Sequence, residues 1–163
     1  MSWFKRLKEG IQTTTKNKKE APDGLWYKCK ECKEASTMKE FKENYYKCPK
    51  CDYHARIGSK EYFEIIFPQG HTALFNNIES EDFLNFVDLK PYKDRLVDAK
   101  KKTKLDDALS VAYGQLGEFK IPLTVACMDF SFIGGSMGSV VGEKIALAIE
   151  YCIEKKSALL IIS

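Results

Sequence analysis

The sequence predicts an α/β protein preceded by a small metal-stabilised module. Three observations support this prediction. Two Cys-x-x-Cys pairs lie near the N-terminus, at Cys29, Cys32, Cys48 and Cys51. In the second half of the chain, stretches rich in small and β-branched residues alternate with a helical pattern. A glycine-rich stretch separates one of these expected strands from the helix that follows it, which is typical of a ligand-binding loop.

The four cysteines of the two pairs are expected to bind one zinc ion. Two thiolates two residues apart can face one ion from a tight turn, and two such turns complete a tetrahedron with zinc–sulfur bonds of about 2.3 Å. The 15-residue gap between Cys32 and Cys48 fits a short β-hairpin. The alternative is a pair of disulfides, which the lack of a recognisable secretory signal disfavours. Because protein would supply all four ligands, we expect a structural zinc.

The charges of the 163 residues are unevenly distributed. Residues 1–60 contain 15 lysines and arginines against 8 acidic residues, a net charge of +7, whereas residues 61–163 carry −4. A basic zinc module suggests contact with a polyanion such as nucleic acid or a nucleotide-containing cofactor. The alternative is a solvated lysine-rich surface. The longest apolar run, Ala158–Ile162, is too short to span a bilayer, so we expect a cytoplasmic protein.

Composition divides the chain into three parts. Residues 1–24 are expected to form a flexible tail, in which Trp3, Phe4, Leu7 and Ile11 have helical spacing. Residues 25–58 are expected to form the zinc ribbon, with strands at residues 26–28 and 45–47 leading into the two cysteine pairs. Its His54 is a further candidate ligand, but four cysteines already complete the ligand set. Residues 59–163 are expected to form the first part of the α/β domain.

Residues 59–105 have mainly helical patterns. We expect Ser59 to cap a helix that ends at Pro68. A second helix is expected from Ser80, with its apolar residues packed inward: Phe83, Leu84, Phe86 and Val87. Residues 100–102 are expected to form a solvated turn or helix end.

From residue 108 the pattern changes to strands. Residues 108–116 and 121–130 are expected to form a hairpin. After the glycines, a helix with Ser139 as its N-cap is expected to bury one stripe: Val141, Ile145, Ala148, Ile149 and Cys152. Residues 158–162 then resemble a buried strand, parallel to the one before the loop. Cys127 and Cys152 are expected to be buried hydrophobic residues rather than reactive thiols.

Gly134 and Gly135 are the candidate chemical site of this domain. Adjacent glycines between a strand and a helix let the backbone approach a ligand, and the N–H groups at the helix start favour negative charge. The loop could bind a phosphate or form an oxyanion hole for a thioester. The alternative is a tight turn with close helix packing. Since no Ser-His-Asp or Cys-His set is visible, catalysis would depend on backbone donors.

Two motifs resemble the beta subunit of bacterial acetyl-coenzyme A carboxylase carboxyltransferase. They are residues 46–57, YKCPKCDYHARI, and residues 128–144, MDFSFIGGSMGSVVGEK. The resemblance implies a crotonase-like fold and transfer of a carboxyl group from carboxybiotin to acetyl-coenzyme A, giving malonyl-coenzyme A for fatty-acid synthesis. It also implies a zinc site at the four cysteines and backbone oxyanion donors at Gly134 and Gly135.

The same resemblance implies partners. They are a carboxyltransferase alpha subunit in an alpha2beta2 heterotetramer, the biotin carboxyl carrier protein and biotin carboxylase, the last belonging to an ATP-binding holoenzyme. Members of the family continue with a second glycine-rich loop after the strand that ends near Ser163. The sequence therefore reads as an N-terminal part of a beta subunit, and we expect it to be inactive alone.

A second hypothesis treats the ribbon as a nucleic-acid-binding module. Its net positive charge accompanies aromatic side chains that could stack on bases. These are Trp26, Tyr27, Tyr45, Tyr46 and Tyr53. The glycine loop favours the enzyme, because a nucleic-acid module needs no such loop.

Overall fold

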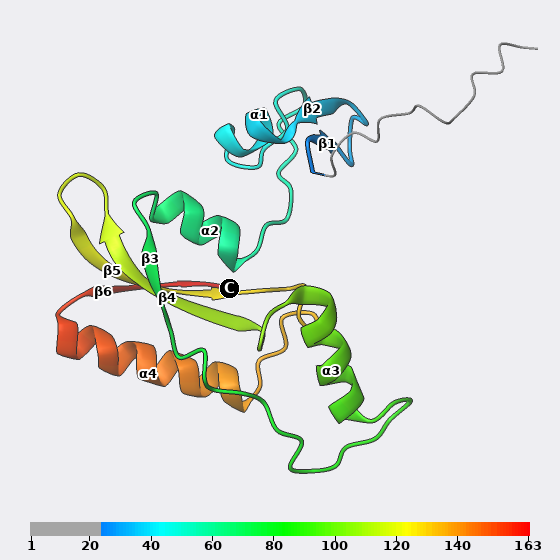
Figure 1. The fold of residues 1–163 in the computed structure, drawn as a ribbon, viewed down its shortest axis with the longest axis vertical. Helices are drawn as coiled ribbons and strands as arrows, with labels where there is room; N and C mark the ends of the chain where they lie inside the picture. The colour runs from blue at the N-terminus through cyan, green and yellow to red at the C-terminus, as the bar shows by residue number, and fades with distance from the viewer. Residues whose placement is uncertain (1–23) are drawn as a thin grey trace, which may run out of the picture. The chain divides into compact units, whose positions relative to one another are not determined.

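A computed structural model describes residues 24–163 (Figure 1). The chain divides into two compact units, with the division between Ala55 and Arg56. The tail predicted for residues 1–24, with its helical spacing from Trp3 to Ile11, lies almost entirely outside the described residues. Among residues 24–163, no helix is long and apolar enough to cross a bilayer.

The described part of the first unit, from residue 24 on, contains two short strands and one helix. They are β1 (Trp26–Lys28), β2 (Ala35–Thr37) and α1 (Met38–Glu43). The strand predicted at residues 26–28 is confirmed, and it pairs antiparallel with β2. The hairpin encloses the first cysteine pair, so the prediction of a hairpin between the pairs is wrong. A helix follows β2 directly because Thr37 caps it: the Glu40 amide donates to Thr37 Oγ1 at 3.1 Å, and the Thr37 amide donates to Glu40 Oε2 at 3.0 Å.

Aromatic rings fill the small core of this unit. The ring of Tyr27 stacks on Phe41 with centroids 3.6 Å apart, and Tyr46 meets Phe41 edge-on at 5.4 Å. Tyr45 and Tyr46 have φ angles of 53° and 59°, so the strand predicted at residues 45–47 is wrong. The left-handed turn lets the Tyr46 amide donate to the Phe41 carbonyl at 2.9 Å, which directs the Tyr46 ring inward.

The second unit is a four-stranded sheet with helices on both faces (Figure 1). Its elements are α2 (Ser59–Ile66), β3 (His71–Leu74), α3 (Tyr92–Thr103), β4 (Leu109–Leu116), β5 (Ile121–Met128), α4 (Ser139–Lys155) and β6 (Ala158–Ile162). The strand order is β3-β4-β5-β6. The predicted hairpin of β4 and β5 and the parallel pairing of β5 with β6 are confirmed. Strand β3, which includes His71, was missed because it lies in a stretch read as helical.

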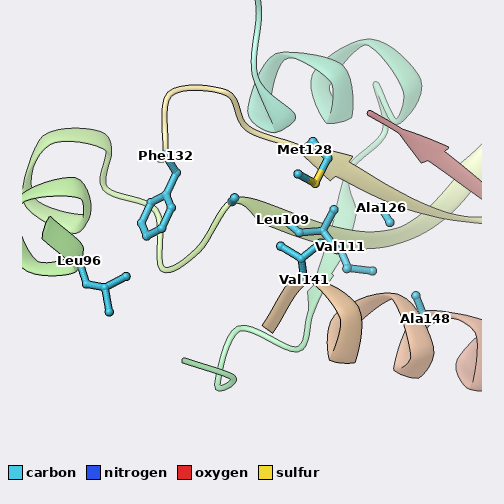
Figure 2. Packing of buried hydrophobic residues seen from close by; sticks show 9 residues of the cluster. Leu96, Leu109, Val111, Ala126, Met128, Phe132, Val141 and Ala148 are labelled. Carbon is cyan, nitrogen blue, oxygen red and sulfur yellow. The ribbon is translucent and has the colours of Figure 1, made fainter. Parts of the chain in front are cut away.

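Alternate side chains of the central strands pack on opposite faces of the sheet. On one face, Val125 and Cys127 pack with Phe63 of α2 and with Phe67, which directly follows that helix. On the other face, the cluster is built around α4 and reaches Leu96 of α3 (Figure 2). Its labelled members are Leu96, Leu109, Val111, Ala126, Met128, Phe132, Val141 and Ala148. Both faces of β5 are therefore buried, as in the central strand of an α/β sheet.

Strand β6 is less buried than predicted. It is the end strand of the sheet within the described residues, and Leu160 and Ile161 are 40% and 44% exposed. In α4, Ile149 of the predicted stripe is 44% exposed, whereas Val141, Ala148 and Cys152 are buried. The first helical residue is Ser139 and the N-cap is Gly138, so the predicted Ser139 cap is wrong by one position.

The helix predicted from Ser80 is absent from the described structure, and its apolar residues are exposed rather than packed inward. Phe83 is 77% exposed and Leu84 is 86% exposed. Asp82 and Asp88 accept hydrogen bonds from the amides of Phe86 and Lys90, and such local bonds compete with a helix. Pro91 also disfavours helix before it, and α3 begins at the next residue.

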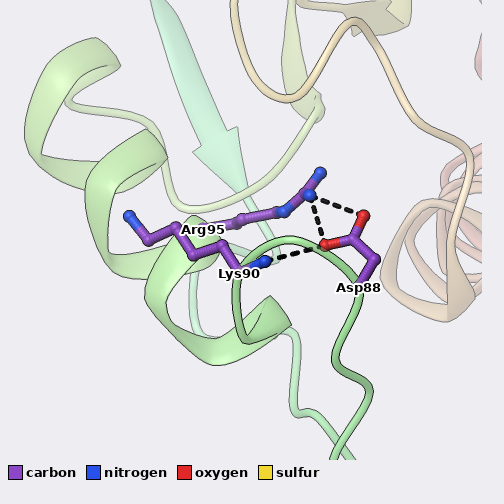
Figure 3. A network of polar contacts seen from close by, with 3 residues as sticks. All are labelled: Asp88, Lys90 and Arg95. Carbon is purple, nitrogen blue, oxygen red and sulfur yellow. Dashed lines mark hydrogen bonds and ion pairs between the residues drawn. The ribbon is translucent and has the colours of Figure 1, made fainter.

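Asp88 also anchors the loop to α3. Its carboxylate accepts two hydrogen bonds from Nη2 of Arg95, one of them at 2.6 Å, together with the Lys90 amide (Figure 3). The hydrogen bond from the Lys90 amide, together with the Arg95 charge, holds the pKa of Asp88 below its usual value. This network therefore sets where the loop joins the first turns of α3.

Candidate functional sites: a cysteine cluster and a glycine loop

The four cysteine sulfurs of the ribbon converge on one point. The Sγ atoms of Cys29 and Cys51 lie 3.7 Å apart, and those of Cys32 and Cys48 lie 3.8 Å apart. All four Sγ atoms lie within 4.8 Å of one another. These sulfurs are far beyond the bond length of about 2.05 Å in a disulfide, and all four cysteines are free thiols.

The spacing of the sulfurs fits a tetrahedral zinc site. Four ligands at about 2.3 Å from a central ion would be about 3.8 Å from one another. These two sulfur–sulfur distances match this value, and each of them joins one member of each Cys-x-x-Cys pair. His54 is not part of the cluster but forms an isolated bridge with Lys47. Thiolate is also the ligand type that zinc prefers in closed structural sites.

The backbone around the first cysteine pair favours a thiolate. Burial acts to raise the pKa of Cys29, but the amides of Cys32 and Glu31 bond to its sulfur, and the pKa falls to about 7. The Glu31 amide lies 3.4 Å from that sulfur. At Cys32 the Glu34 amide acts to lower the pKa, yet burial and the neighbouring thiols raise it to about 12. Without a cation, the cluster therefore accommodates few negative charges at once.

The glycine loop joins β5 to α4 in the second unit. Ile133, Gly134 and Gly135 have φ angles of 43°, 70° and 73°, so three consecutive residues are left-handed. Glycine adopts such angles freely, whereas a β-branched residue is strained there. Strain of this kind gathers at binding and catalytic sites. A Cβ on Gly134 would meet no atom within 4 Å, so the backbone conformation, and not crowding, favours glycine at this position.

The two glycine amides differ in their partners. The Gly135 N–H donates to the Phe132 carbonyl at 2.9 Å and closes a turn. The Gly134 N–H has no acceptor among residues 24–163. Phe132 itself is 2% exposed and belongs to the core around α4 (Figure 2). The loop therefore has a buried anchor next to an exposed glycine with an available donor.

Sequence reasoning missed Asp129, which caps α2 from a distance. Its Oδ1 atom accepts a hydrogen bond from the Ser59 amide at 2.8 Å, across 70 residues of sequence. Gly58 is the N-cap and Ser59 the first helical residue, so the prediction that Ser59 caps this helix is wrong. A carboxylate at a helix N-terminus is favoured by the free amides and by the helix dipole. No local pattern near Ser59 indicates this partner.

A second missed residue is Lys144, which is buried in α4. Its Nζ atom donates to the Leu109 carbonyl at 3.1 Å. Burial lowers its pKa, while the charges of Asp107 and Asp106 act in the opposite direction. It lines a cavity of about 410 Å³, together with polar residues that include Ser59, Lys60, His71 and Asp107.

Several known proteins that are similar to this chain have the same name. No protein-family model matches the chain. It is 56% identical to the acetyl-coenzyme A carboxylase carboxyl transferase subunit beta of Pedobacter heparinus over 165 aligned positions, which cover all of this chain and 58% of the relative. The proteins of the same name from Amoebophilus asiaticus and Flavobacterium psychrophilum are 52% and 49% identical, and the chain covers 57% of each.

The chain is a homologue of these beta subunits. It spans somewhat more than half of their length. The two motifs that carried the resemblance correspond to the two sites of the structure. Residues 46–57 of this beta-subunit homologue hold the second cysteine pair, and residues 128–144 form the glycine loop with the first turns of α4.

Proposed function

We propose that the chain is the part of a carboxyltransferase beta subunit that holds a structural zinc ribbon and one oxyanion loop. The reaction would move a carboxyl group from carboxybiotin to acetyl-coenzyme A and give malonyl-coenzyme A, the first step of fatty-acid synthesis. The observation that carries the proposal is the identity of 56% over all 163 residues with a protein of this name. The core would then be crotonase-like and the protein cytoplasmic.

Zinc would be held by the four clustered cysteines. Cys29, Cys32, Cys48 and Cys51 supply four sulfurs at tetrahedral spacing, so the ion would be closed to substrate. When bound, it would neutralise the thiolates and add its binding energy to the small aromatic core of this segment. Catalysis would then take place away from the ribbon.

The glycine loop would contribute backbone donors to the reaction. The methyl carbon of acetyl-coenzyme A must lose a proton before it can accept a carboxyl group, which places negative charge on the thioester oxygen. The Gly134 N–H is the first candidate donor to this oxygen, because Phe132 already occupies the Gly135 N–H. Gly135 would keep the turn closed, and its N–H would donate to the thioester oxygen only if its hydrogen bond to the Phe132 carbonyl lengthened. Preorganised amides of this kind are worth about 10²–10³ in turnover each.

The remaining components would be separate chains. They are the alpha subunit in an alpha2beta2 assembly, the carrier protein that bears biotin, and biotin carboxylase with its ATP site. The 163 residues span 58% of the Pedobacter heparinus relative. We therefore expect the carboxyl transfer to need both the remaining part of such a subunit and the alpha partner.

The test compares two glycines with similar φ angles and similar open space around the α-carbon. Gly134 and Gly117 both have positive φ, at 70° and 65°, and both would place a Cβ in open space. Valine at either position should strain the backbone alike. In the protein carrying this sequence, assembled with its alpha partner, Gly134→Val should lower malonyl-coenzyme A formation about 100-fold, with Gly117→Val close to wild type. Equal rates for the two variants would refute the proposed donor role.

Nucleic-acid binding by the ribbon is the second candidate. Trp26 and Tyr45 are 62% and 72% exposed, so their rings would be available to stack on bases. Tyr27 and Tyr46 are instead packed on Phe41, which leaves fewer aromatic side chains for bases than the five predicted. Such binding would be an additional property of the ribbon and would not replace carboxyl transfer.

A further inference from the structure

Two buried ionisable residues flank the glycine loop in the chain. Asp129 follows β5 directly and is 4% exposed, and Lys144 lies in the second turn of α4 and is 3% exposed. The loop, residues 130–138, connects them. Burying a charged side chain is costly unless it is paired or hydrogen-bonded, so two such residues around one loop require a physical reason.

Asp129 fastens the incoming end of the loop. Its amide donates to the Ala108 carbonyl at 2.7 Å, and its Oδ2 atom accepts from the Ser110 hydroxyl at 3.4 Å. Its Oδ1 atom binds the Ser59 amide at the start of α2. A side chain on Gly58 would collide with Asp129 Oδ1, so the helix start and the carboxylate are in close contact. One carboxylate thus connects β4 and α2 to the residue that begins the loop.

Lys144 fastens the outgoing end of the loop. The ladder between β3 and β4 ends at the pair Leu74 and Val111, so the Leu109 carbonyl lies beyond the last residue of β3. The Lys144 ammonium donates to this carbonyl at 3.1 Å. Asp107, which is 7% exposed, offsets part of the cost of burying the positive charge. The start of α4 is thereby connected to β4.

The hydrogen bonds of Asp129 and Lys144 involve three consecutive residues. Ala108 and Ser110 bind Asp129, and Leu109 between them binds Lys144. A chain of backbone bonds then runs from Asp129 into the loop. The Phe132 amide donates to the Asp129 carbonyl at 3.1 Å, and the Gly135 amide donates to the Phe132 carbonyl at 2.9 Å. A shift at Asp129 would therefore be passed to the glycines by direct hydrogen bonds.

We infer that Asp129 and Lys144 are positioning residues that together hold the glycine loop in its left-handed conformation against residues 108–110. The inference rests on the proposed function for its catalytic consequence, because the loop matters to the reaction only if its amides meet the thioester oxygen. Both residues would act on the reaction indirectly, by fixing the backbone at the two ends of the loop.

The first test measures hydrogen–deuterium exchange of the protein alone, without any assay of carboxyl transfer. Asp129→Ala and Lys144→Met should each accelerate exchange in residues 130–138 about tenfold, with β5 unchanged. Asp129→Asn keeps an oxygen acceptor for the Ser59 amide and should restore most of the protection. Matched controls are Asp98→Ala and Lys155→Met, whose side chains are exposed and paired with Lys90 and Glu154. They should leave the loop unchanged.

Two exchange results would overturn the inference. One is unchanged exchange in residues 130–138 for both Asp129→Ala and Lys144→Met. The other is equal acceleration in the loop and in β5, which would mean a general loss of stability and no specific hold on the loop. If Asp129→Ala does not fold, Asp129→Asn and Lys144→Met carry the measurement, with a smaller acceleration expected for Asp129→Asn.

The second test measures turnover of the assembled enzyme. Lys144→Met should lower kcat for malonyl-coenzyme A formation about tenfold and change KM for acetyl-coenzyme A less than twofold, because a displaced donor acts mainly on the transition state. A loosened loop with unchanged kcat would overturn the catalytic part of the inference. Full activity of Gly134→Val would instead refute the proposed oxyanion role, and the exchange result would still decide whether Asp129 and Lys144 hold the loop.

Discussion

The ring of Phe67 lies directly against the α-carbon of Gly114. A Cβ on Gly114 would lie 2.6 Å from Cδ1 of that ring, closer than atoms in a packed core approach. Phe67 is 2% exposed and follows α2, and Gly114 lies within β4. The absent side chain therefore lets α2 pack on the sheet, and α2 is the helix whose first amide Asp129 binds.

Gly114→Ala should destabilise the protein by about 1–3 kcal/mol, because an added methyl group overpacks the contact with Phe67. The matched control is Gly142→Ala in α4, where the new Cβ would meet no atom within 4 Å. This control should stabilise the protein by about 0.5–1 kcal/mol, because glycine is unfavourable inside a helix. Urea unfolding of the second unit measures both values. A neutral Gly114→Ala would show that α2 moves away at no cost.

Purified protein should contain about one zinc per chain, and Cys48→Ser should lose it. Cys48 is 2% exposed, and its sulfur lies 3.8 Å from that of Cys32, so replacing it removes one of the four expected ligands. Elemental analysis measures the content. Cys152→Ala, which lies outside the cluster, should keep the metal. Metal-free wild-type protein with disulfides among these cysteines would contradict the site.

Cys127 should resist alkylation in the folded protein. It is fully buried, and burial together with the charges of Asp129 and Glu61 raises the pKa of its thiol to about 12. Almost none of it is therefore thiolate at pH 8, and the thiolate is the reactive form. Mass spectrometry after iodoacetamide treatment measures this.

Two reference samples make the alkylation experiment decisive. After zinc is removed by a chelator, the exposed Cys51 should react. In denaturant, all 6 cysteines should react. Labelling of Cys127 at the rate of Cys51 in the folded, chelated protein would show that its surroundings open readily.

Nucleic acid should bind the ribbon weakly, without sequence preference and with affinity that falls steeply as salt rises, because phosphate contacts release counterions. Removing the exposed rings by Trp26→Ala and Tyr45→Ala should lower affinity for single strands further, by loss of stacking. Phe119→Ala is the control, since this aromatic ring is 89% exposed but lies in the second unit. Fluorescence anisotropy at two salt concentrations measures the effect. Salt-independent or sequence-specific binding would argue against this electrostatic account.

Several features that depend on neighbouring residues were predicted correctly, although the strand at residues 45–47 and the caps at Ser59 and Ser139 were not. The Cys-x-x-Cys spacing indicates a four-sulfur cluster, because two cysteines separated by two residues can direct both thiolates to one side of a tight turn. The hairpin of β4 and β5 follows from two apolar stretches separated by turn residues, and the parallel return to β6 follows from the helical pattern between β5 and β6. The position of Gly134 and Gly135 between a strand and a helix follows in the same way. Their role as donors stays a prediction.

Features in which other interactions compete with a local pattern were not predictable in this way. The hydrogen bonds that Asp82 and Asp88 accept from nearby backbone amides, together with Pro91, outweigh the helical spacing of Phe83 and Leu84. Exposure of β6 depends on which strand lies beside it.

The sequence by itself determined which four cysteines cluster and the strand–loop–helix order around the glycines, because both follow from spacing along the chain. Only the tertiary structure decided what holds that loop. Asp129 binds the amide of Ser59 across 70 residues of sequence, and Lys144 reaches Leu109 across 35. A hydrogen bond between such distant residues leaves no periodic pattern in the sequence, because its donor and acceptor meet only after the sheet and its helices have packed.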